Sequence, residues 1–416
     1  RTIIVKLLVF AHTPPPHHGQ SYMVKLMLEC LGGDARSRAK AGLAPSEIQC
    51  YHVNCRYSED LEDIGSFRFV KAWLVVRYCL EAIWCRFRYK VPAFYYVPAP
   101  GKRAALYRDW IVMLLCRPFF RHFIHHWHAV GLGDWLRSEG TWLERWLTHR
   151  LLGNASLGIA LAIPSMRDAL WFTTQRVELV ANGIPDPCPD FEQFIATRRK
   201  ARVAMRQRIL SGETAGTNRQ DDLTGPDPDV FRVLYLAHGL REKGVFDALE
   251  AIAIAQKRSD KEQIGIRFHL TVAGEFPRDE ERATFDERAG REDLAGAVKY
   301  AGFVTGEAKS KLLEESDCLC FPTYYHAESF GLVVVEAMAA GMTVVTTRWR
   351  AIPEVLPSEY PGIVPVRSAE SVADALIKAL GRDDAQQLRH HFVAHFTERQ
   401  HVDCLQRALL LTARAE

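Results

Sequence analysis

The chain has 416 residues, of which 48% are hydrophobic and 25% charged, ordinary values for a soluble globular protein of two or three domains. Its formal net charge of +3 lacks the strong positive excess of nucleic-acid-binding proteins, so we expect no nucleic-acid partner. The ten cysteines follow no repeated spacing, and we interpret them as core thiols of a cytoplasmic protein.

The first half of the chain alternates apolar strands with helices, which predicts a doubly wound α/β domain. The first strand, residues 3–10, leads through a loop rich in proline and histidine, containing Gly19, into a helix that begins near Tyr22. Doubly wound sheets admit phosphates at a glycine in this place. Further strands are expected at 47–53, 93–97, 121–126, 157–163 and from 177, and helices at 67–89, 103–116 and 134–152. Asn182 and Gly183 predict a closing turn with positive φ.

Four histidines, His122, His125, His126 and His128, cluster around the strand at 121–126. Side chains alternate along a strand, so His126 and His128 share one face and His125 points to the other. The cluster is therefore not expected to converge on a metal ion, and we predict no metal site in the chain.

Residues 64–150 contain 14 Lys and Arg against 5 Asp and Glu, together with many aromatic side chains. The apolar stretch 67–89 within this region carries charged residues such as Arg77 and Glu81, so it is not a plain membrane span. We expect the basic region to contact an anionic membrane surface. A solvated basic face is the alternative interpretation.

Between residues 186 and 229 the composition changes to a basic helical stretch followed by polar, turn-forming residues, which predicts a domain junction. Its end spells Asp227-Pro-Asp229, a pattern that can hold a metal–nucleotide complex. This pair precedes a strand, whereas sites in parallel sheets lie beyond the carboxyl ends of strands. We therefore assign no function to it.

A second doubly wound unit begins with a strand at 231–236, a turn that contains Arg241 and Lys243, and an amphipathic helix through residue 256. Strands at 267–274 and 298–304 and a helix at 307–315 follow. The stretch 318–347 then predicts a strand, a loop, a buried apolar helix from Gly331, a left-handed C-cap at Gly341 and a last strand.

Two carboxylates stand out in this stretch. Glu328 precedes the helix, and Glu336 lies inside it, among apolar residues where a carboxylate needs a partner. Between them, Ser329 is expected to cap the helix, and Gly331 lets a ligand approach the backbone. A helix start favours an anion, and Glu336 lies roughly 7–8 Å beyond it. Carboxylates on both sides of an anion site suit a nucleotide sugar, which has hydroxyls on both sides of its phosphates.

Glu328 and Glu336 form the pattern E-x7-E, and the surrounding sequence PTYYHAESFGLVVVEAMAAG resembles the retaining GT-B glycosyltransferases of family 4, the glycosyl transferases group 1. The resemblance implies an α/β protein of the GT-B fold, with two Rossmann-like doubly wound domains facing a cleft. It implies an acceptor-side domain at 1–190, to which a C-terminal helix at about 400–416 returns. A basic and polar junction at 191–229 and a nucleotide-sugar donor domain at 230–399 complete the expected order.

The resemblance also implies roles around the E-x7-E pattern. Glu328 would hold hydroxyls of the donor sugar, and Glu336 would take the ribose hydroxyls. The backbone of Phe330, Gly331 and Leu332 would lie near the sugar and phosphate. Phe303 and Val304, which end the strand at 298–304, match the segment beside the nucleobase.

Further donor-binding residues follow from the same resemblance. Lys243 matches a cation on the donor diphosphate, and Arg241 is a candidate second cation because His238 stands where the family has an arginine. Gly19 matches the glycine that lets the backbone approach the diphosphate, and His128 matches a histidine that reaches the donor sugar. The expected catalytic residues are Glu328, His128 and Lys243.

The implied reaction transfers a hexose with retention, from a nucleotide-diphosphate sugar to a hydroxyl of a glycan or lipid-linked acceptor, in polysaccharide or glycolipid assembly. No cofactor and no metal are expected. We expect a cytoplasmic protein that is peripheral on the inner membrane face. Two alternatives remain open. One is another enzyme of the same fold, such as a nucleotide-sugar epimerase or a glycoside phosphorylase, and the other is a non-catalytic membrane-surface adaptor.

Overall fold

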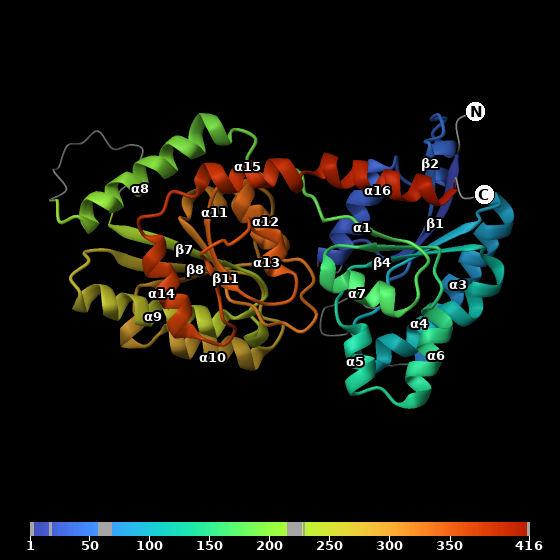
Figure 1. Ribbon diagram of the computed structural model, residues 1–416, viewed down its shortest axis with the longest axis horizontal. Coiled ribbons are helices and arrows are strands. Elements are labelled where there is room, and N and C mark those ends of the chain that lie inside the picture. Colours follow the sequence, from blue (N-terminus) through green and yellow to red (C-terminus); the bar gives the residue numbers. More distant parts are fainter. Residues whose placement is uncertain (1–3, 16–18, 57–68, 214–226, 228, 414–416) are drawn as a thin grey trace. The chain divides into compact units, whose positions relative to one another are not determined.

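A computed structural model describes residues 4–15, 19–56, 69–213, 227 and 229–413 of the chain (Figure 1). The chain divides into two compact units. Unit 1 contains residues 1–183 and 398–416, and unit 2 contains residues 184–397. Each unit is built on a parallel six-stranded sheet, which confirms the predicted α/β fold of two doubly wound, Rossmann-like units.

The sheet of unit 1 has the strand order β2-β1-β3-β4-β5-β6. Its strands are β1 (Val5–Ala11), β2 (Ile48–Asn54), β3 (Ala93–Tyr96), β4 (His122–Trp127), β5 (Leu157–Ala160) and β6 (Val177–Leu179). Its helices are α1 (Gly19–Cys30), α2 (Ala35–Lys40), α3 (Phe69–Tyr89), α4 (Arg103–Cys116), α5 (Leu132–Ser138), α6 (Trp142–Leu152), α7 (Ile163–Trp171) and α16 (Glu398–Ala413). The strand order reverses beside β1, which puts helices on both faces of the sheet.

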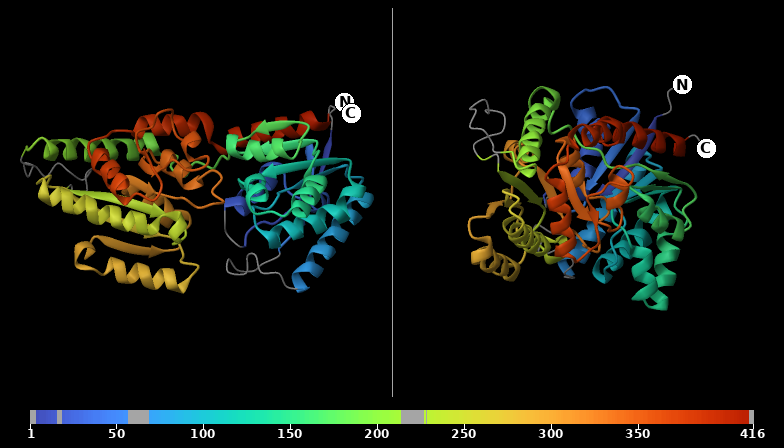
Figure 2. Two further views of the ribbon diagram at one scale, coloured as in Figure 1. Left: turned by 60° about the horizontal axis from the view of Figure 1, so that its bottom comes forward. Right: turned by 60° about the vertical axis from the view of Figure 1, so that its left-hand side comes forward.

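Both faces of this sheet are buried, which explains why its strands read as almost continuous apolar runs. Along β1, Leu8 and Phe10 point into a core shared with α3 and α4. The alternate residues, Leu7 and Val9, point into a core shared with α1 and α16. Figure 2 shows α16, in red, beside the blue N-terminal elements. The last helix is thus part of the core of unit 1.

The sheet of unit 2 has the order β12-β11-β10-β7-β8-β9. Its strands are β7 (Val230–Leu236), β8 (Arg267–Ala273), β9 (Val298–Gly302), β10 (Cys318–Phe321), β11 (Thr343–Thr347) and β12 (Ile363–Val364). Its α-helices are α8 (Ala196–Leu210), α9 (Val245–Lys261), α10 (Asp279–Ala289), α11 (Gly306–Glu315), α12 (Leu332–Ala339), α13 (Ile352–Val355), α14 (Ala369–Ala379) and α15 (Ala385–His395). Helices α9 and α14 share a core with one face of the sheet, and α12 packs against α15 and the strands β10 and β11.

Helix α8 falls in the segment expected as a junction, and it belongs to unit 2. Its Arg199, Arg202 and Arg206 are at most 8% exposed. The Arg199 guanidinium donates to three backbone carbonyls of unit 2, and Arg202 and Arg206 form ion pairs with Asp317. Buried arginines need such partners, so the basic pattern attaches this helix to unit 2. Residues 214–226 of the expected junction lie outside the described residues.

Two local predictions for unit 1 were wrong. The expected helix at 134–152 is two helices, because Thr141 and Glu144 form a reciprocal capping box that starts α6. Asn182 and Gly183 do not adopt positive φ. Helices α2, α7, α10 and α13 were not anticipated. Among the described residues, no helix is both long and apolar enough to cross a membrane.

Candidate functional site

The sheet of unit 2 reverses its strand order between β7 and β10. In open parallel sheets, ligands bind beyond the carboxyl ends of the strands at such a reversal. The loop after β7 contains Lys243, and the loop after β10 contains Glu328. Two of the residues predicted from the sequence therefore lie at the place where the topology of unit 2 favours a ligand.

Backbone hydrogen bonds link the loops along this edge of the sheet. Gly274 N donates to Gly302 O at 2.8 Å, Gly239 N to Glu275 O at 2.7 Å, and Tyr324 N to Glu242 O at 2.8 Å. The loops after β9, β8, β7 and β10 are thereby joined in series. This framework holds the backbone on which the candidate side chains stand.

Gly244 lets the two central loops approach closely. Its φ is 87°, and a Cβ atom at this position would lie 2.3 Å from the carbonyl oxygen of Pro322. Only glycine accepts both the left-handed backbone and this approach. The contact brings the turn at Arg241–Lys243 against the loop that follows β10.

Lys243 and Glu328 form an ion pair across these loops. Lys243 Nζ lies 2.5 Å from Glu328 Oε2, and the two side chains are 17% and 10% exposed. The ammonium also lies 4.7 Å from the ring centroid of Tyr325. Desolvated charges of this kind must be paired. An ammonium has three donors, so Lys243 can hold Glu328 and still donate to a ligand oxygen.

Helix α12 begins directly beside this pair. Gly331 precedes it with φ of 75° and ψ of 63°, and no side chain caps the first turn. The prediction that Ser329 caps this helix was therefore wrong, because the left-handed Gly331 takes the cap position. The side chain of Phe330 is buried against Phe396, so Phe330, like Gly331, offers its backbone to a ligand. Leu332 is the first residue of the helix. Uncapped N–H groups at a helix start attract anions.

Glu336 stands one turn into α12 and has a partner that the sequence did not reveal. Lys309 Nζ of α11 lies 2.8 Å from Glu336 Oε1. The side chain of Glu336 is 14% exposed and that of Lys309 is 30% exposed. The pair satisfies a carboxylate in a mostly apolar helix while leaving oxygen lone pairs for hydroxyl donors.

His238 is a second nitrogen group near Lys243. The Arg241 guanidinium lies over the ring of Phe246, 4.5 Å from its centroid. Burial lowers the pKa of His238, and the charge of Lys243 lowers it further. His238 Nδ1 is buried without a hydrogen-bond partner among the described residues. The role expected for Arg241 stays a prediction.

Phe303 and Val304 follow β9, the edge strand of the sheet. Gly302 ends this strand with φ of 70°, and the Phe303 side chain is 48% exposed while Val304 is half-buried. An exposed aromatic ring at the carboxyl edge is suited to stacking on a planar base. The nucleobase role stays a prediction.

The other two predicted residues, Gly19 and His128, belong to unit 1. Gly19 is the exposed first residue of α1. His128 follows β4, is 6% exposed, and has its ring centroid 4.0 Å from that of His126. The structure brings His126 and His128 together, as strand alternation predicts, and it turns His125 into the opposite core against Tyr96 and Trp127.

Burial, together with nearby His128 and His401, holds the pKa of His126 well below its ordinary value. Burial also lowers the pKa of His125 to about 3. Both rings are therefore neutral at physiological pH. Over the described part of the chain, no group of three or more His, Cys, Asp or Glu side chains is arranged to hold a metal ion. In the Asp227-Pro-Asp229 pattern, the Asp229 carboxylate forms an ion pair with Arg267 at the amino end of β7.

Residues 218–397, somewhat less than half of the chain, match the sequence model for glycosyl transferases group 1. This segment contains β7 to β12 and both ion pairs of the candidate site.

Curated relatives match over a similar part. A phosphatidyl-myo-inositol mannosyltransferase of Mycolicibacterium smegmatis is 40% identical over 133 residues, 32% of each chain. A putative colanic acid biosynthesis glycosyltransferase, WcaL of Escherichia coli, is 29% identical over 151 residues, 35% of each chain. The matched part thus spans about a third of these relatives' own length.

Solved structures resemble the whole chain. HepE of Anabaena, in complex with UDP and glucose, has a TM-score of 0.62 at 14% identity and covers 98% of this chain and 100% of its own. Sucrose-phosphate synthase of Thermosynechococcus elongatus has a TM-score of 0.65 at 16% identity, with 99% and 100% covered. Identities this low establish the fold alone. The chain therefore has the GT-B fold, and its residues 218–397 are similar in sequence to glycosyl transferases group 1.

Proposed function

We propose that this chain is a retaining glycosyltransferase that moves a sugar from a nucleotide-diphosphate sugar to an acceptor hydroxyl. The observation that carries the proposal is the Lys243–Glu328 ion pair, placed at the strand-order reversal of unit 2 beside the uncapped start of α12. A cation, free N–H groups and a carboxylate converge there. A diphosphate bonded to a hydroxyl-rich sugar requires this combination of groups.

Lys243 and the start of α12 stabilise the leaving group. As the bond between the anomeric carbon and the phosphate oxygen breaks, negative charge grows on the diphosphate. An ammonium and backbone N–H groups that are already in place stabilise this charge without reorganising. They supply positive potential from the protein itself, so we propose that transfer needs no divalent metal and no cofactor.

Glu328 orients the sugar by accepting hydrogen bonds from its hydroxyls. The acceptor oxygen forms its new bond to the anomeric carbon on the face that the diphosphate leaves, which preserves the anomeric configuration. The acceptor hydroxyl proton passes to the departing phosphate oxygen, so that atoms and charge balance. The ion pair with Lys243 leaves lone pairs of the Glu328 carboxylate free for these hydrogen bonds.

Glu336 and Phe303 recognise the nucleoside. The Glu336 carboxylate, held by Lys309, accepts hydrogen bonds from the ribose hydroxyls, and the ring of Phe303 lies against the base, with Val304 beside it. The diphosphate then spans the start of α12, between the two carboxylates.

The acceptor is a glycan or a lipid-linked molecule. The names of the relatives support this class, since one is a phosphatidyl-myo-inositol mannosyltransferase and another is named as a putative colanic acid biosynthesis glycosyltransferase. Such acceptors are assembled at membranes, and we place the chain on the cytoplasmic face of one, as a peripheral protein.

The test begins with the donor. Thermal unfolding is measured with UDP-, GDP- and ADP-linked hexoses, because a ligand at 100 times its Kd stabilises the native state by about 2.7 kcal/mol. The stabilising donor is then incubated with glycan and phosphatidyl-myo-inositol acceptors, and the anomeric configuration of the product is determined by NMR. A product with the donor's configuration supports the proposal. A product of inverted anomeric configuration would contradict it, and so would the absence of stabilisation by any donor. Release of the sugar that depends on added phosphate, or conversion of the donor without an acceptor, would contradict it as well.

A further inference from the structure

Helix α3 of unit 1 presents an apolar stripe to solvent. Trp73, Leu80, Trp84 and Phe87 are 66%, 58%, 53% and 64% exposed. With the exposed Arg77, their positions advance by four, three, four and three residues, so all five lie on one face of the helix. Isolated exposed apolar residues are common, but a continuous row of large ones marks a contact surface.

The opposite face of the same helix already fills the core. Val75, Cys79, Ala82 and Cys85 are at most 3% exposed and pack under the sheet. An ordinary surface helix is polar on its outer side. Helix α3 is therefore apolar on both sides. On the outer side, Trp84 and Phe87 make edge contacts with Tyr89 and Phe119, yet both side chains remain more than half exposed.

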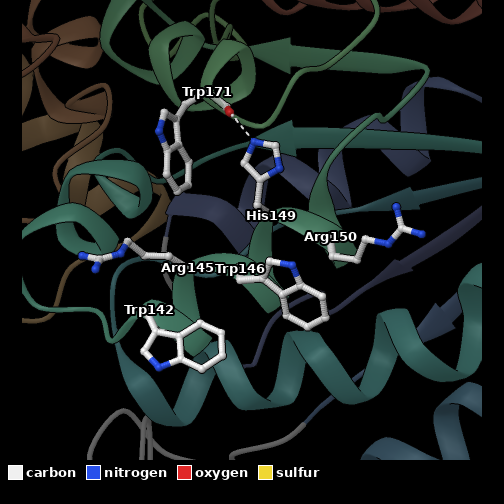
Figure 3. Close-up of a pocket in the computed structure, with 6 residues that line it drawn as sticks. All are labelled: Trp142, Arg145, Trp146, His149, Arg150 and Trp171. Carbon is white, nitrogen blue, oxygen red and sulfur yellow. Dashed lines mark hydrogen bonds between the residues drawn. The ribbon is translucent and has the colours of Figure 1, made fainter.

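Helix α6 has the same character. Its Trp142 and Trp146 are 71% and 58% exposed, and they line a shallow pocket of about 390 Å³ with His149 and Trp171 (Figure 3). Figure 3 shows the Arg145 and Arg150 side chains pointing away from each other on opposite sides of the indoles. Small-molecule sites need converging polar groups, so we interpret this pocket as part of a larger surface.

The two helices belong to one layer. Helix α4 packs against both α3 and α6, on the same face of the sheet (Figure 1). Its Leu114 is also exposed. Of the nine tryptophans of the chain, the four that are exposed all lie on α3 and α6. We call α3, α4 and α6 the outer helix layer.

The charges of this layer favour an anionic partner. Arg77, Arg88 and Lys90 are exposed along or just after α3, and Arg145 and Arg150 flank the indoles of α6. The acidic residue of α3, Glu81, pairs with Arg36, and Glu144 of α6 pairs with Arg103. The acids are thus neutralised within the fold, and the positive charge remains available.

We propose that the outer helix layer docks on the surface of an anionic lipid bilayer, with its indole and phenyl rings in the interfacial region and its arginines on the lipid phosphates. Tryptophan prefers this interfacial region, and basic residues around an apolar face are typical of helices that lie on membranes. The proposal deepens the peripheral location given under the proposed function by naming the surface that binds lipid. Its test is separate from the transferase reaction, since it concerns side chains of unit 1 alone.

The test is binding to vesicles of equimolar phosphatidylglycerol and phosphatidylcholine, with phosphatidylcholine vesicles for comparison. We expect Trp84→Ser/Phe87→Ser and Trp142→Ser/Trp146→Ser each to weaken binding to the anionic vesicles about tenfold or more. Arg77→Glu/Arg88→Glu should weaken it about tenfold as well and flatten its dependence on salt. Brominated lipids should quench the tryptophan fluorescence of the unaltered protein.

Matched controls lie in unit 2, where Phe194 and Val393 are 57% and 48% exposed and Arg198 and Lys200 are exposed. Phe194→Ser/Val393→Ser and Arg198→Glu/Lys200→Glu should bind like the unaltered protein, and circular dichroism verifies that all variants fold. Equal binding to both vesicle types, or equal losses in controls and test variants, would overturn the proposal. So would a concentration-dependent dimer that the tryptophan variants abolish in a protein that binds no vesicles.

Discussion

Lys243 Nζ lies 2.5 Å from Glu328 Oε2, although the two residues are 85 positions apart in the sequence. From the sequence, each is expected to contact a ligand independently. The structure shows that each is also the partner of the other, in a site where both side chains are mostly withdrawn from water. Substitutions at these positions therefore have two separable effects, one on transfer and one on stability.

We expect Glu328→Gln and Lys243→Met each to lower kcat by about 100-fold or more, because each removes a group that acts on the donor as charge develops. The measurement is the initial rate at saturating donor. Glu242→Gln is the matched control, since this adjacent carboxylate is 52% exposed and points to His326. Wild-type turnover in a folded Glu328→Gln variant would contradict the role of Glu328, and the same result in Lys243→Met would contradict the role of Lys243.

The same variants form a double-mutant cycle for the free energy of unfolding. Each single substitution leaves a mostly buried polar or charged partner unsatisfied and should lower the free energy of unfolding by about 1–3 kcal/mol. The double variant Lys243→Met/Glu328→Gln should recover part of this loss without recovering activity. Urea unfolding gives the coupling free energy, and strictly additive losses would show that the pair does not form.

Glu336→Gln should raise the KM for the donor by about tenfold, since a hydrogen bond to a charged group contributes about 1.5–3 kcal/mol. Its kcat should change little, because the ribose is remote from the bond that breaks. Lys309→Met, which releases Glu336, should raise KM by a smaller factor. Lys311→Met is the control, as Lys311 is 70% exposed and pairs with Glu315. A fall in kcat at constant KM would contradict the ribose role.

Gly244→Ala should abolish transfer by separating the loops that carry Lys243 and Glu328. The new Cβ would meet the carbonyl oxygen of Pro322 at 2.3 Å. Gly296→Ala is the matched control, because Gly296 has a similar positive φ of 76° with no atom within 4 Å of the new Cβ. The control should lose only about 1–2 kcal/mol of stability. Equal activity in the two variants would show that the contact with Pro322 does not position the site.

Stability should depend on pH through Asp317. Burial alone would raise the pKa of this carboxyl, but Arg206, Arg202 and the backbone N–H of Arg232 outweigh burial and hold the pKa below its ordinary value. A lowered folded-state pKa stabilises the native state above the unfolded pKa of about 3.9, and this contribution disappears as pH falls through the folded value. Asp317→Asn should therefore lose stability at pH 7 and show a flatter decline in acid. Parallel pH curves for both proteins would contradict this.

Transfer should survive exhaustive treatment with EDTA, because Lys243 and the start of α12 supply the positive potential that the diphosphate needs. The assay compares treated protein with protein supplied with magnesium, manganese or zinc. If activity disappears and returns with one of these ions, the proposed stabilisation of the leaving group is wrong.

The strands were predictable from the sequence because parallel strands buried on both faces read as short apolar runs. The boundaries of the helices were harder to predict from the sequence. The apolar pattern of 134–152 continues through the break between α5 and α6, and the signal that would have located it is the Thr141–Glu144 capping pattern. Helix α10 was not predicted because most of its residues are polar and only Glu281 and Phe285 are buried, so the sequence has no apolar periodicity there.

For the candidate site, the family resemblance indicated Lys243, Glu328 and Glu336, but it did not indicate the residues that pair with them. The partners Lys243–Glu328 and Lys309–Glu336 come from different loops and helices, so no local pattern records them. The place of Arg241 over Phe246 likewise depends on how the turn packs. Ser329 was misassigned because propensity favours serine as a cap, whereas the backbone turns at Gly331.

Helix α16 also sets an order of events during synthesis. Leu405 and Leu409 complete a core that Val9 and Met27 begin, yet the ribosome makes residues 398–413 only after all of unit 2. Domains usually fold as they emerge, the N-terminal one first. Here unit 1 is made before unit 2 but needs helix α16, so the part of its core that α16 covers is completed only after unit 2 has been translated.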